Sequence, residues 1–197
     1  MAYPINIRIS QKYAYLYIKY NKMANIQKYI PFLFKWEGTK FVDDPNDRGG
    51  ATKMGVILST WRKIGYDKDK DGDIDVEDLK LITKDDVVNK VLKPYCWDKW
   101  KADEINNQSI ANLLVDWLWT SGKWGIILPQ KILDVKQDGI VGKITLDAIN
   151  NNKDKKNLFN QLWNRRLKHF QDIVKKDPSQ KKFLRGWTNR LQDLRYS

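Results

Sequence analysis

From Met23 onward, apolar side chains recur at intervals of three and four residues, which is the spacing of a helix. The segment 23–38 shows this first, with Ile26, Ile30 and Leu33 on one predicted face. The same spacing predicts further helices over residues 56–65, 83–94, 109–122 and 156–176, and two short ones around a glycine-rich turn in 128–152. No segment of this part alternates apolar and polar residues for long, as a half-buried strand does. We therefore expect a mainly α fold.

Residue types typical of helix ends support these boundaries. Gly65 and Gly122 each follow an apolar pattern, where a glycine can end a helix in a left-handed conformation. Thr83 has an acidic residue three positions later, a pair that satisfies free amide donors at a helix start. Ser109 is the predicted cap of the next helix, and Pro94 is expected just beyond the end of the preceding one. The helix that follows Ser109 is mostly apolar, which predicts a buried central helix.

Residues 1–22 do not fit the helical pattern. They are basic, and Arg8, Lys12 and repeated tyrosines interrupt their apolar residues, so a signal peptide is not predicted. No segment of the chain has the unbroken apolar run of about 18 residues that a transmembrane helix needs. Because a fresh helical pattern begins at Met23, we interpret 1–22 as an N-terminal extension that need not be native.

Charge is concentrated toward the C-terminus. The formal net charge is +12, and residues 151–197 hold thirteen basic and four acidic side chains. Such a surface would suit nucleic acid, an anionic membrane or an anionic wall polymer as a partner. The alternative is a solvated surface without a specific partner. Cys96 is the only cysteine, so no intramolecular disulfide is possible. Separately, we expect the protein to be a monomer. His169 is the only histidine, which leaves little for a Ser-His-Asp hydrolase or a histidine-ligated zinc site.

The segment DKDKDGDIDVED, residues 67–78, has the ligand spacing of an EF-hand calcium loop. Acidic residues stand at alternate positions, which suits a hard cation, and Gly72 permits the sharp turn at the sixth position. The twelfth position holds an Asp where a longer bidentate Glu is usual. We predict a structural Ca²⁺ site, and the alternative is a solvated acidic loop. The predicted ligands are Asp67, Asp69, Asp71, Asp73 through its carbonyl, and Asp78.

Glu37 is a candidate catalytic acid because of its position after the apolar run IPFLFKW. Apolar surface disfavours the ionised form of a carboxyl group, and glycoside hydrolysis needs an acid that keeps its proton until the leaving oxygen takes it. The next turn, DDPNDRGGAT, offers acidic groups and two glycines that allow close approach to a substrate. Of these we expect Asp44, Gly49 and Gly50 to bind substrate. An ordinary helix-end Glu followed by an ordinary turn remains the alternative.

Several motifs, taken in order, resemble one known family. KWEGTKFVDDPNDRGGATKMGV at 35–56, YCWDKW at 95–100 and DWLWTSG at 116–122 are similar to segments of the glycoside hydrolase family 108 lysozymes. DGIVGKITLDAIN and KKFLRGWTNRL resemble the predicted peptidoglycan-binding domain usually paired with them. The resemblance implies a lysozyme-like helical catalytic domain over 23–122 and a small helical peptidoglycan-binding region over 123–197.

The resemblance also implies an activity, cleavage of the β-1,4 bond between N-acetylmuramic acid and N-acetylglucosamine in peptidoglycan, with Glu37 as general acid. Asp47 and Thr52 match acidic and hydroxyl positions that could position water or stabilise the oxocarbenium-like state. Asp116 and Ser121 match a polar helix motif that is expected to line the groove.

Tryptophans suit a saccharide substrate without proving it. Their flat faces can stack on sugars, but most tryptophans at helical spacing fill cores, so we expect only one or two in the groove. We predict that Trp97 is a substrate-binding residue.

Two other functions stay open. A cell-wall-binding protein without catalysis would be consistent with Thr39 and Thr120, which stand where the family favours Gly and Asn. A nucleic-acid binder would use the basic C-terminus, but no base-reading motif is present and no nucleic acid is expected as a partner. An enzyme without an export signal would be made in a bacterial or phage-infected cytoplasm, and would reach the wall after lysis or dedicated export, as an endolysin or an effector does.

Overall fold

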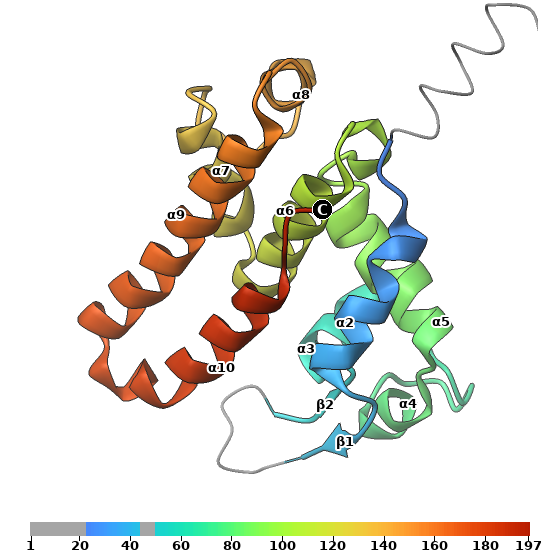
Figure 1. Ribbon diagram of the computed structural model, residues 1–197. Helices are drawn as coiled ribbons and strands as arrows, with labels where there is room; N and C mark the ends of the chain where they lie inside the picture. The colour runs from blue at the N-terminus through green and yellow to red at the C-terminus, as the bar shows by residue number, and fades with distance from the viewer. Residues whose placement is uncertain (1–22, 44–49) are drawn as a thin grey trace, which may run out of the picture.

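The computed structural model of the chain describes residues 23–43 and 50–197, and these are mainly helical, as predicted (Figure 1). The helices and strands, in chain order, are η1 (Ile26–Lys28), α2 (Ile30–Glu37), β1 (Phe41–Val42), β2 (Thr52–Lys53), β3 (Val56–Ile57), α3 (Leu58–Ile64), α4 (Val76–Leu81), α5 (Lys84–Asp86), η2 (Val87–Trp97), η3 (Ala102–Glu104), α6 (Gln108–Ser121), α7 (Trp124–Ile132), α8 (Lys143–Asn150), α9 (Lys155–Lys176), η4 (Pro178–Gln180) and α10 (Lys181–Asp193). Among the described helices, none is both long enough and apolar enough to cross a membrane.

A small antiparallel sheet follows α2. Its strands lie in the order β1-β2-β3, with Val42 opposite Thr52 and Lys53 opposite Val56. The two-residue turn between β2 and β3 has positive φ at both positions, 50° at Met54 and 76° at Gly55, as a tight hairpin turn requires. Each strand has only two residues, which is too short for the alternation that identifies a strand in a sequence.

Three of the predicted helix ends are confirmed. Gly65 ends α3 in the left-handed conformation, with φ 71° and ψ 31°. Thr83 and Asp86 form a reciprocal capping box at the start of α5. Gly122 follows α6 with φ 53°, and its N–H donates to the carbonyl of Leu118.

Two predicted helix ends are wrong. Pro94 lies inside a continuous helix, because α5 passes into the π-helical segment η2, which ends at Trp97. A proline ring clashes with the carbonyl four residues earlier in an α-helix, whereas hydrogen bonds here span five residues, as from Asp98 N–H to Lys93. The N-cap of α6 is Asn107 rather than Ser109, since the Asn107 side chain accepts from the Ile110 N–H at 2.9 Å.

Helix α6 is the centre of the molecule (Figure 1). From Ser109 to Leu118 every residue except Asn112 is buried, and α6 packs against η2, α7 and α9. A second, smaller core surrounds the buried Trp61 beneath the hairpin, α3 and α4. Because α6 contacts helices from both halves of the chain, polar side chains on it can join these halves.

Helix α10 closes the molecule against its N-terminal part. Lys35 and Trp36, at the end of α2, both bind the Asp193 carboxylate, at 2.6 and 3.0 Å. The last helix therefore lies directly beside the helix that carries Glu37.

Candidate active site

Glu37 is the last residue of α2 and is held at a rigid helix end. Gly38 follows with φ 67°, and its N–H donates to the carbonyl of Phe34, which closes the final turn. The Glu37 side chain is 15% exposed, so its carboxylate is largely enclosed but still reaches solvent. This is the accessibility that a group transferring a proton to a bound substrate needs.

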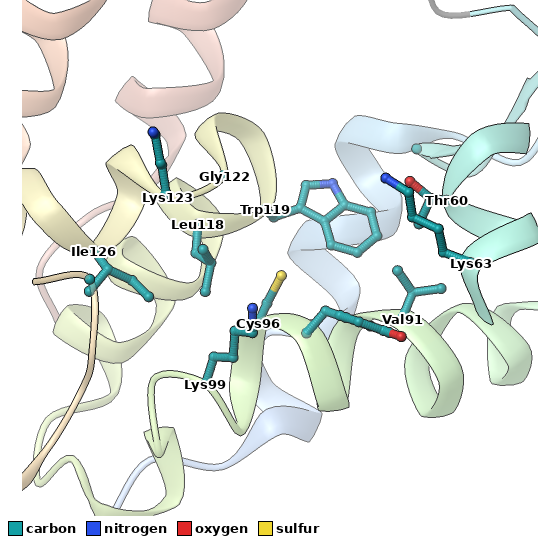
Figure 2. Close-up of a pocket in the computed structure, with 13 residues that line it drawn as sticks. Thr60, Lys63, Val91, Cys96, Lys99, Leu118, Trp119, Gly122, Lys123 and Ile126 are labelled. Carbon is teal, nitrogen blue, oxygen red and sulfur yellow. The ribbon is translucent and has the colours of Figure 1, made fainter.

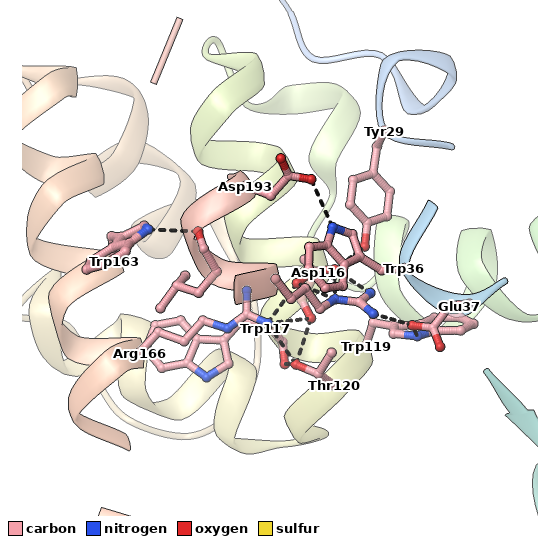
Figure 3. Close-up of polar contacts among 12 residues, drawn as sticks. Tyr29, Trp36, Glu37, Asp116, Trp117, Trp119, Thr120, Trp163, Arg166 and Asp193 are labelled. Carbon is pink, nitrogen blue, oxygen red and sulfur yellow. Dashed lines mark hydrogen bonds and ion pairs between the residues drawn. The ribbon is translucent and has the colours of Figure 1, made fainter. Parts of the chain in front are cut away.

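Two side chains hold one oxygen of the Glu37 carboxylate. Trp119 Nε1 donates to Oε1 at 2.8 Å, and Arg190 Nη1 donates to the same oxygen at 2.6 Å (Figure 3). Trp119 comes from α6 and Arg190 from α10, so three helices converge on this atom. The apolar surroundings expected for Glu37 are therefore only partly present, because the indole of Trp119 is accompanied by a guanidinium.

The other oxygen of Glu37 faces the hairpin turn at Gly55. A methyl group built on Gly55 would lie 2.5 Å from Oε2 of Glu37, which is closer than real contacts allow. Gly55 thus has two reasons to be glycine, its φ of 76° and the carboxylate beside it. Among the described residues, none donates a hydrogen bond to Oε2.

Arg190 belongs to a buried ion cluster built around Asp116. Arg190 Nη2 and Nε donate to Asp116 at 2.8 and 3.1 Å, and Arg166 Nη2 donates to the same carboxylate at 2.7 Å. Tyr29 adds a hydrogen bond of 2.7 Å from its hydroxyl (Figure 3). Two guanidinium groups thus bind Asp116, and one of them, that of Arg190, also binds Glu37.

The protonation states within this cluster follow from its geometry. Burial alone would raise the pKa of Asp116, but the charges of Arg166 and Arg190 outweigh burial and hold this pKa below its usual range. Burial and the Asp116 charge raise the pKa of Tyr29 well above its ordinary value. Asp116 is therefore ionised and Tyr29 is a neutral donor at neutral pH.

A cavity of about 390 Å³ is lined by residues that lie next to the Glu37 carboxylate (Figure 2). These include Gly55 and Trp119, two of the residues beside that carboxylate, together with side chains from α3, η2 and α7. Three of its lining residues are lysines, Lys63, Lys99 and Lys123. The volume is within the range of small-ligand pockets and suits a few sugar units of a longer strand.

Part of the predicted catalytic turn can be placed. Thr52 lies on β2, two residues before the turn that contacts Glu37, and its hydroxyl donates to the carbonyl of Gly50 at 3.0 Å. The predicted residues Asp44, Asp47 and Gly49 lie outside the described residues. Thr52 therefore belongs to the same hairpin as Gly55.

Two predicted substrate-binding residues are not in the groove. Asp116 is fully buried in the ion cluster, because a charged residue on the all-round buried helix α6 must find internal partners. Trp97 is also fully buried, and its indole N–H donates to Asp103 at 2.8 Å. Ser121 is partly exposed and lies at a separate cavity of about 100 Å³, where Arg166 and Arg190 also contribute.

Arg190 and Gly55 were not identified from the sequence as site residues. Arg190 is 153 positions from Glu37, and nothing in its local sequence distinguishes it from the other basic residues of the C-terminal part. Gly55 follows a positive-φ residue in a tight turn, and only the pairing of two very short strands reveals that turn. The structure also places Trp119 against Glu37, through the hydrogen bond from its indole N–H.

The acidic loop has local geometry that suits a cation. The carboxylates of Asp67, Asp69 and Asp71 lie within 4.8 Å of one another, and those of Asp73, Asp75 and Asp78 form a second such group. The charge of Asp71 raises the pKa of Asp73, as expected for crowded carboxylates. Asp78 is buried and accepts backbone N–H groups of Lys68 and Asp75, so it also fixes the fold of the loop.

Comparisons with known proteins agree on two regions of the chain. Residues 30–122 match the family described as Glycosyl hydrolase 108, and residues 124–192 match the family described as Predicted Peptidoglycan domain. Among solved structures, the chain is similar to the structure of Brucella abortus SagA, with 28% identity and a TM-score of 0.71 over 85% of this chain and 90% of that one. No protein with a curated description matches the chain.

Proposed function

We propose that the protein is a glycoside hydrolase that cleaves peptidoglycan and that Glu37 is its general acid. Residues 30–122 match the family described as Glycosyl hydrolase 108, and a match to the family described as Predicted Peptidoglycan domain follows them. In the proposed reaction Glu37 protonates the oxygen of the β-1,4 bond between N-acetylmuramic acid and N-acetylglucosamine. The bond to the leaving sugar breaks, positive charge develops on the muramic acid ring, and water completes the hydrolysis.

The two oxygens of Glu37 support this proposal. Oε1 accepts hydrogen bonds from Trp119 and Arg190, whereas Oε2 lies beside Gly55, which is one of the residues that line the cavity. One oxygen thus fixes the orientation of the carboxyl group while the other is free to carry and deliver a proton. Fixing a reacting group before the substrate binds lowers the entropic cost of the reaction.

Thr52 and Asp47 are the proposed partners of Glu37 in the reaction. Thr52 lies on β2, in the hairpin whose turn meets the carboxylate, which supports a role for its hydroxyl in positioning water or substrate. Asp47 precedes this strand by five residues and would supply the second carboxylate that glycoside hydrolysis uses.

Replacing Glu37 tests the proposal directly. Glu37→Gln keeps the shape and the hydrogen-bond acceptor for Trp119 and Arg190 but removes the acidic proton. Release of fragments from purified peptidoglycan should fall on the order of 1,000-fold, with the melting temperature little changed. Mass spectrometry of the wild-type digest should show products that end in reducing N-acetylmuramic acid.

Three results would contradict this assignment. Retained lysis in Glu37→Gln would remove Glu37 from its role. Products that end in N-acetylglucosamine, or free stem peptides, would replace the muramidase reaction with another one. If the wild type binds peptidoglycan but releases no reducing ends, the protein is a wall-binding protein without catalysis.

We also propose that the acidic loop holds one calcium ion as a structural ligand. Asp67, Asp69 and Asp71 have the spacing and the mutual proximity that a hard cation requires, and Gly72 takes the turn with φ 102°. The ion would link α3 and α4, which flank the loop, and would relieve the repulsion among the carboxylates.

Calcium removal tests this site. Adding Ca²⁺ to chelator-treated protein should release heat and raise the melting temperature, because a ligand that binds only the folded state stabilises it. Asp71→Asn should weaken both effects. Asp85→Asn, an exposed aspartate outside the loop on α5, is the matched control and should respond as the wild type does. No heat and no change in melting temperature would show that the loop is merely solvated.

A further inference from the structure

A second cavity, of about 620 Å³, lies between α7 and α9 and contains no residue of the proposed active site. Trp124 and Leu128 line it from α7. Helix α9 contributes the remaining side chains, which are mostly charged or polar. These two helices pack against each other along the outer side of α6, as Figure 1 shows. The cavity therefore lies in the part of the chain that matches the peptidoglycan domain.

Trp124 offers an aromatic surface at the edge of this cavity. It is 45% exposed, unlike Trp97, Trp100 and Trp117, which are fully buried. Exposing a large aromatic side chain leaves apolar area in water, and aromatic faces are a usual platform for the apolar side of a ligand ring. The exposure of Trp124 is thus explained if a sugar ring covers it.

His169 supplies a neutral polar group beside Trp124. The two rings lie 6.5 Å apart between centroids, and His169 is half-buried. Burial and then the charge of Arg165 lower the pKa of His169, so the imidazole is uncharged at neutral pH. A neutral imidazole has one donor and one acceptor nitrogen, which matches the hydroxyl and acetamido groups of an amino sugar.

The rest of the cavity is predominantly basic. Arg165, Lys175 and Lys176 line it, and its one carboxylate, on Asp172, is already engaged by Lys168 at 2.9 Å. Nη1 of Arg165 is buried and has no hydrogen-bond partner among the described residues; its ion-pair distance to Asp172 is 4.0 Å. The Arg165 side chain as a whole is 22% exposed, so its charge can still attract an incoming carboxylate.

We propose that this cleft is a peptidoglycan-binding site separate from the active site, in which a sugar stacks on Trp124 and stem-peptide carboxylates bind Arg165, Lys175 and Lys176. The proposal rests on the proposed function, because it takes peptidoglycan as the substrate. Lys123 lines the cavity beside Glu37, and the next residue, Trp124, lines this one. In this proposal the cleft holds peptidoglycan while Glu37 cleaves it.

Binding without cleavage is the appropriate measurement, so the variants are made in full-length Glu37→Gln protein. The probe is insoluble peptidoglycan purified free of teichoic acid, and the bound fraction is measured by sedimentation. Adding Trp124→Ala should weaken binding about fivefold, through loss of one aromatic contact. Adding Lys175→Gln with Lys176→Gln should also weaken binding and should reduce its salt dependence.

Phe183→Ala is the matched control, because Phe183 is 46% exposed on α10 and does not line the cavity. It should bind as the parent does, and circular dichroism should show that every variant is folded. Unchanged binding by the Trp124→Ala protein would overturn the proposal. So would equal binding to peptidoglycan whose stem peptides have been removed, or binding that depends on added teichoic acid.

The two proposals fail in different ways. Lysis that persists in Glu37→Gln contradicts the catalytic role of Glu37 and leaves the sedimentation result intact. Loss of lysis in Glu37→Gln, combined with Trp124-independent binding, contradicts only the second site.

Discussion

At the scale of single residues, the proposed site depends on a glycine as much as on an acid. Glu37 supplies the proton, but the position of its carboxylate is set from one side by Arg190 and limited from the other by Gly55. Oε2 occupies the space that Gly55 leaves, next to a residue that lines the cavity.

Gly55→Ala should therefore impair catalysis more than stability. The new methyl group would displace Oε2, and a misplacement of about 1 Å can cost on the order of 100-fold in kcat. The positive φ adds a stability cost of about 1 kcal/mol. Rates on peptidoglycan and urea unfolding curves would separate the two effects.

Gly65 provides the matched control for this substitution. Its φ is 71°, close to that of Gly55, and nothing lies within 4 Å of a methyl group built there. Gly65→Ala should lose a similar amount of stability and retain its kcat. If both variants lose activity equally, the contact between Gly55 and Glu37 has no catalytic meaning.

At the scale of elements, α6 carries Asp116, whose charge binds side chains from both parts of the chain. Asp116 is fully buried on this helix and depends on Arg166, Arg190 and Tyr29 for compensation. Its folded-state pKa lies below that of an exposed aspartate, so its contribution to stability is complete above the unfolded value of about 3.9 and is lost as pH falls below it.

The pH dependence should appear in the difference in unfolding free energy between the wild type and Asp116→Asn. Near pH 7 the variant should be less stable by about 3–5 kcal/mol, because two buried cations lose their partner. Below about pH 4 the difference in unfolding free energy between the two proteins should become smaller. At such a pH, protonation of Asp116 costs the wild type the charge that the variant lacks at every pH. Urea denaturation between pH 3 and 7 measures it. A gap independent of pH would mean that Asp116 acts by packing alone.

The longer an element of this fold is, the more clearly a sequence pattern predicts it. The long apolar patterns and the signals at Gly65, Thr83 and Gly122 identified helices that the structure contains. Strands of two residues and a helix that continues through Pro94 leave no such pattern. The site follows the same rule: a local motif pointed to Glu37, whereas the pairing of Arg190 with it depends on tertiary packing alone.

At the scale of the whole molecule, the C-terminal half completes the N-terminal one. Arg166 and Arg190 belong to the region that matches the peptidoglycan domain, and Asp116 and Glu37 to the region that matches glycosyl hydrolase 108. The proposed catalytic site is thus shared by both regions.

Arg166→Met and Arg190→Met distinguish stability from catalysis. Both remove a partner of Asp116 and should destabilise the protein by about 3–5 kcal/mol. Only Arg190 contacts Glu37, so Arg190→Met should reduce kcat further, by about tenfold or more relative to Arg166→Met. Arg190→Lys keeps a charge but lacks the fork that spans two carboxylates, and should fall between wild type and Arg190→Met. Equal kcat values for the two Met variants would argue against a role for Arg190 in positioning Glu37.

The ion pair between Arg190 and Glu37 also determines when the proposed site is completed during translation. Glu37 is translated early, and its partner lies in α10, the last helix of the described structure. A chain still on the ribosome can form α2 and the hairpin before Arg190 exists. Full lytic activity is therefore among the last properties that a newly made molecule acquires, so partial translation products of this wall-degrading enzyme should be weakly active.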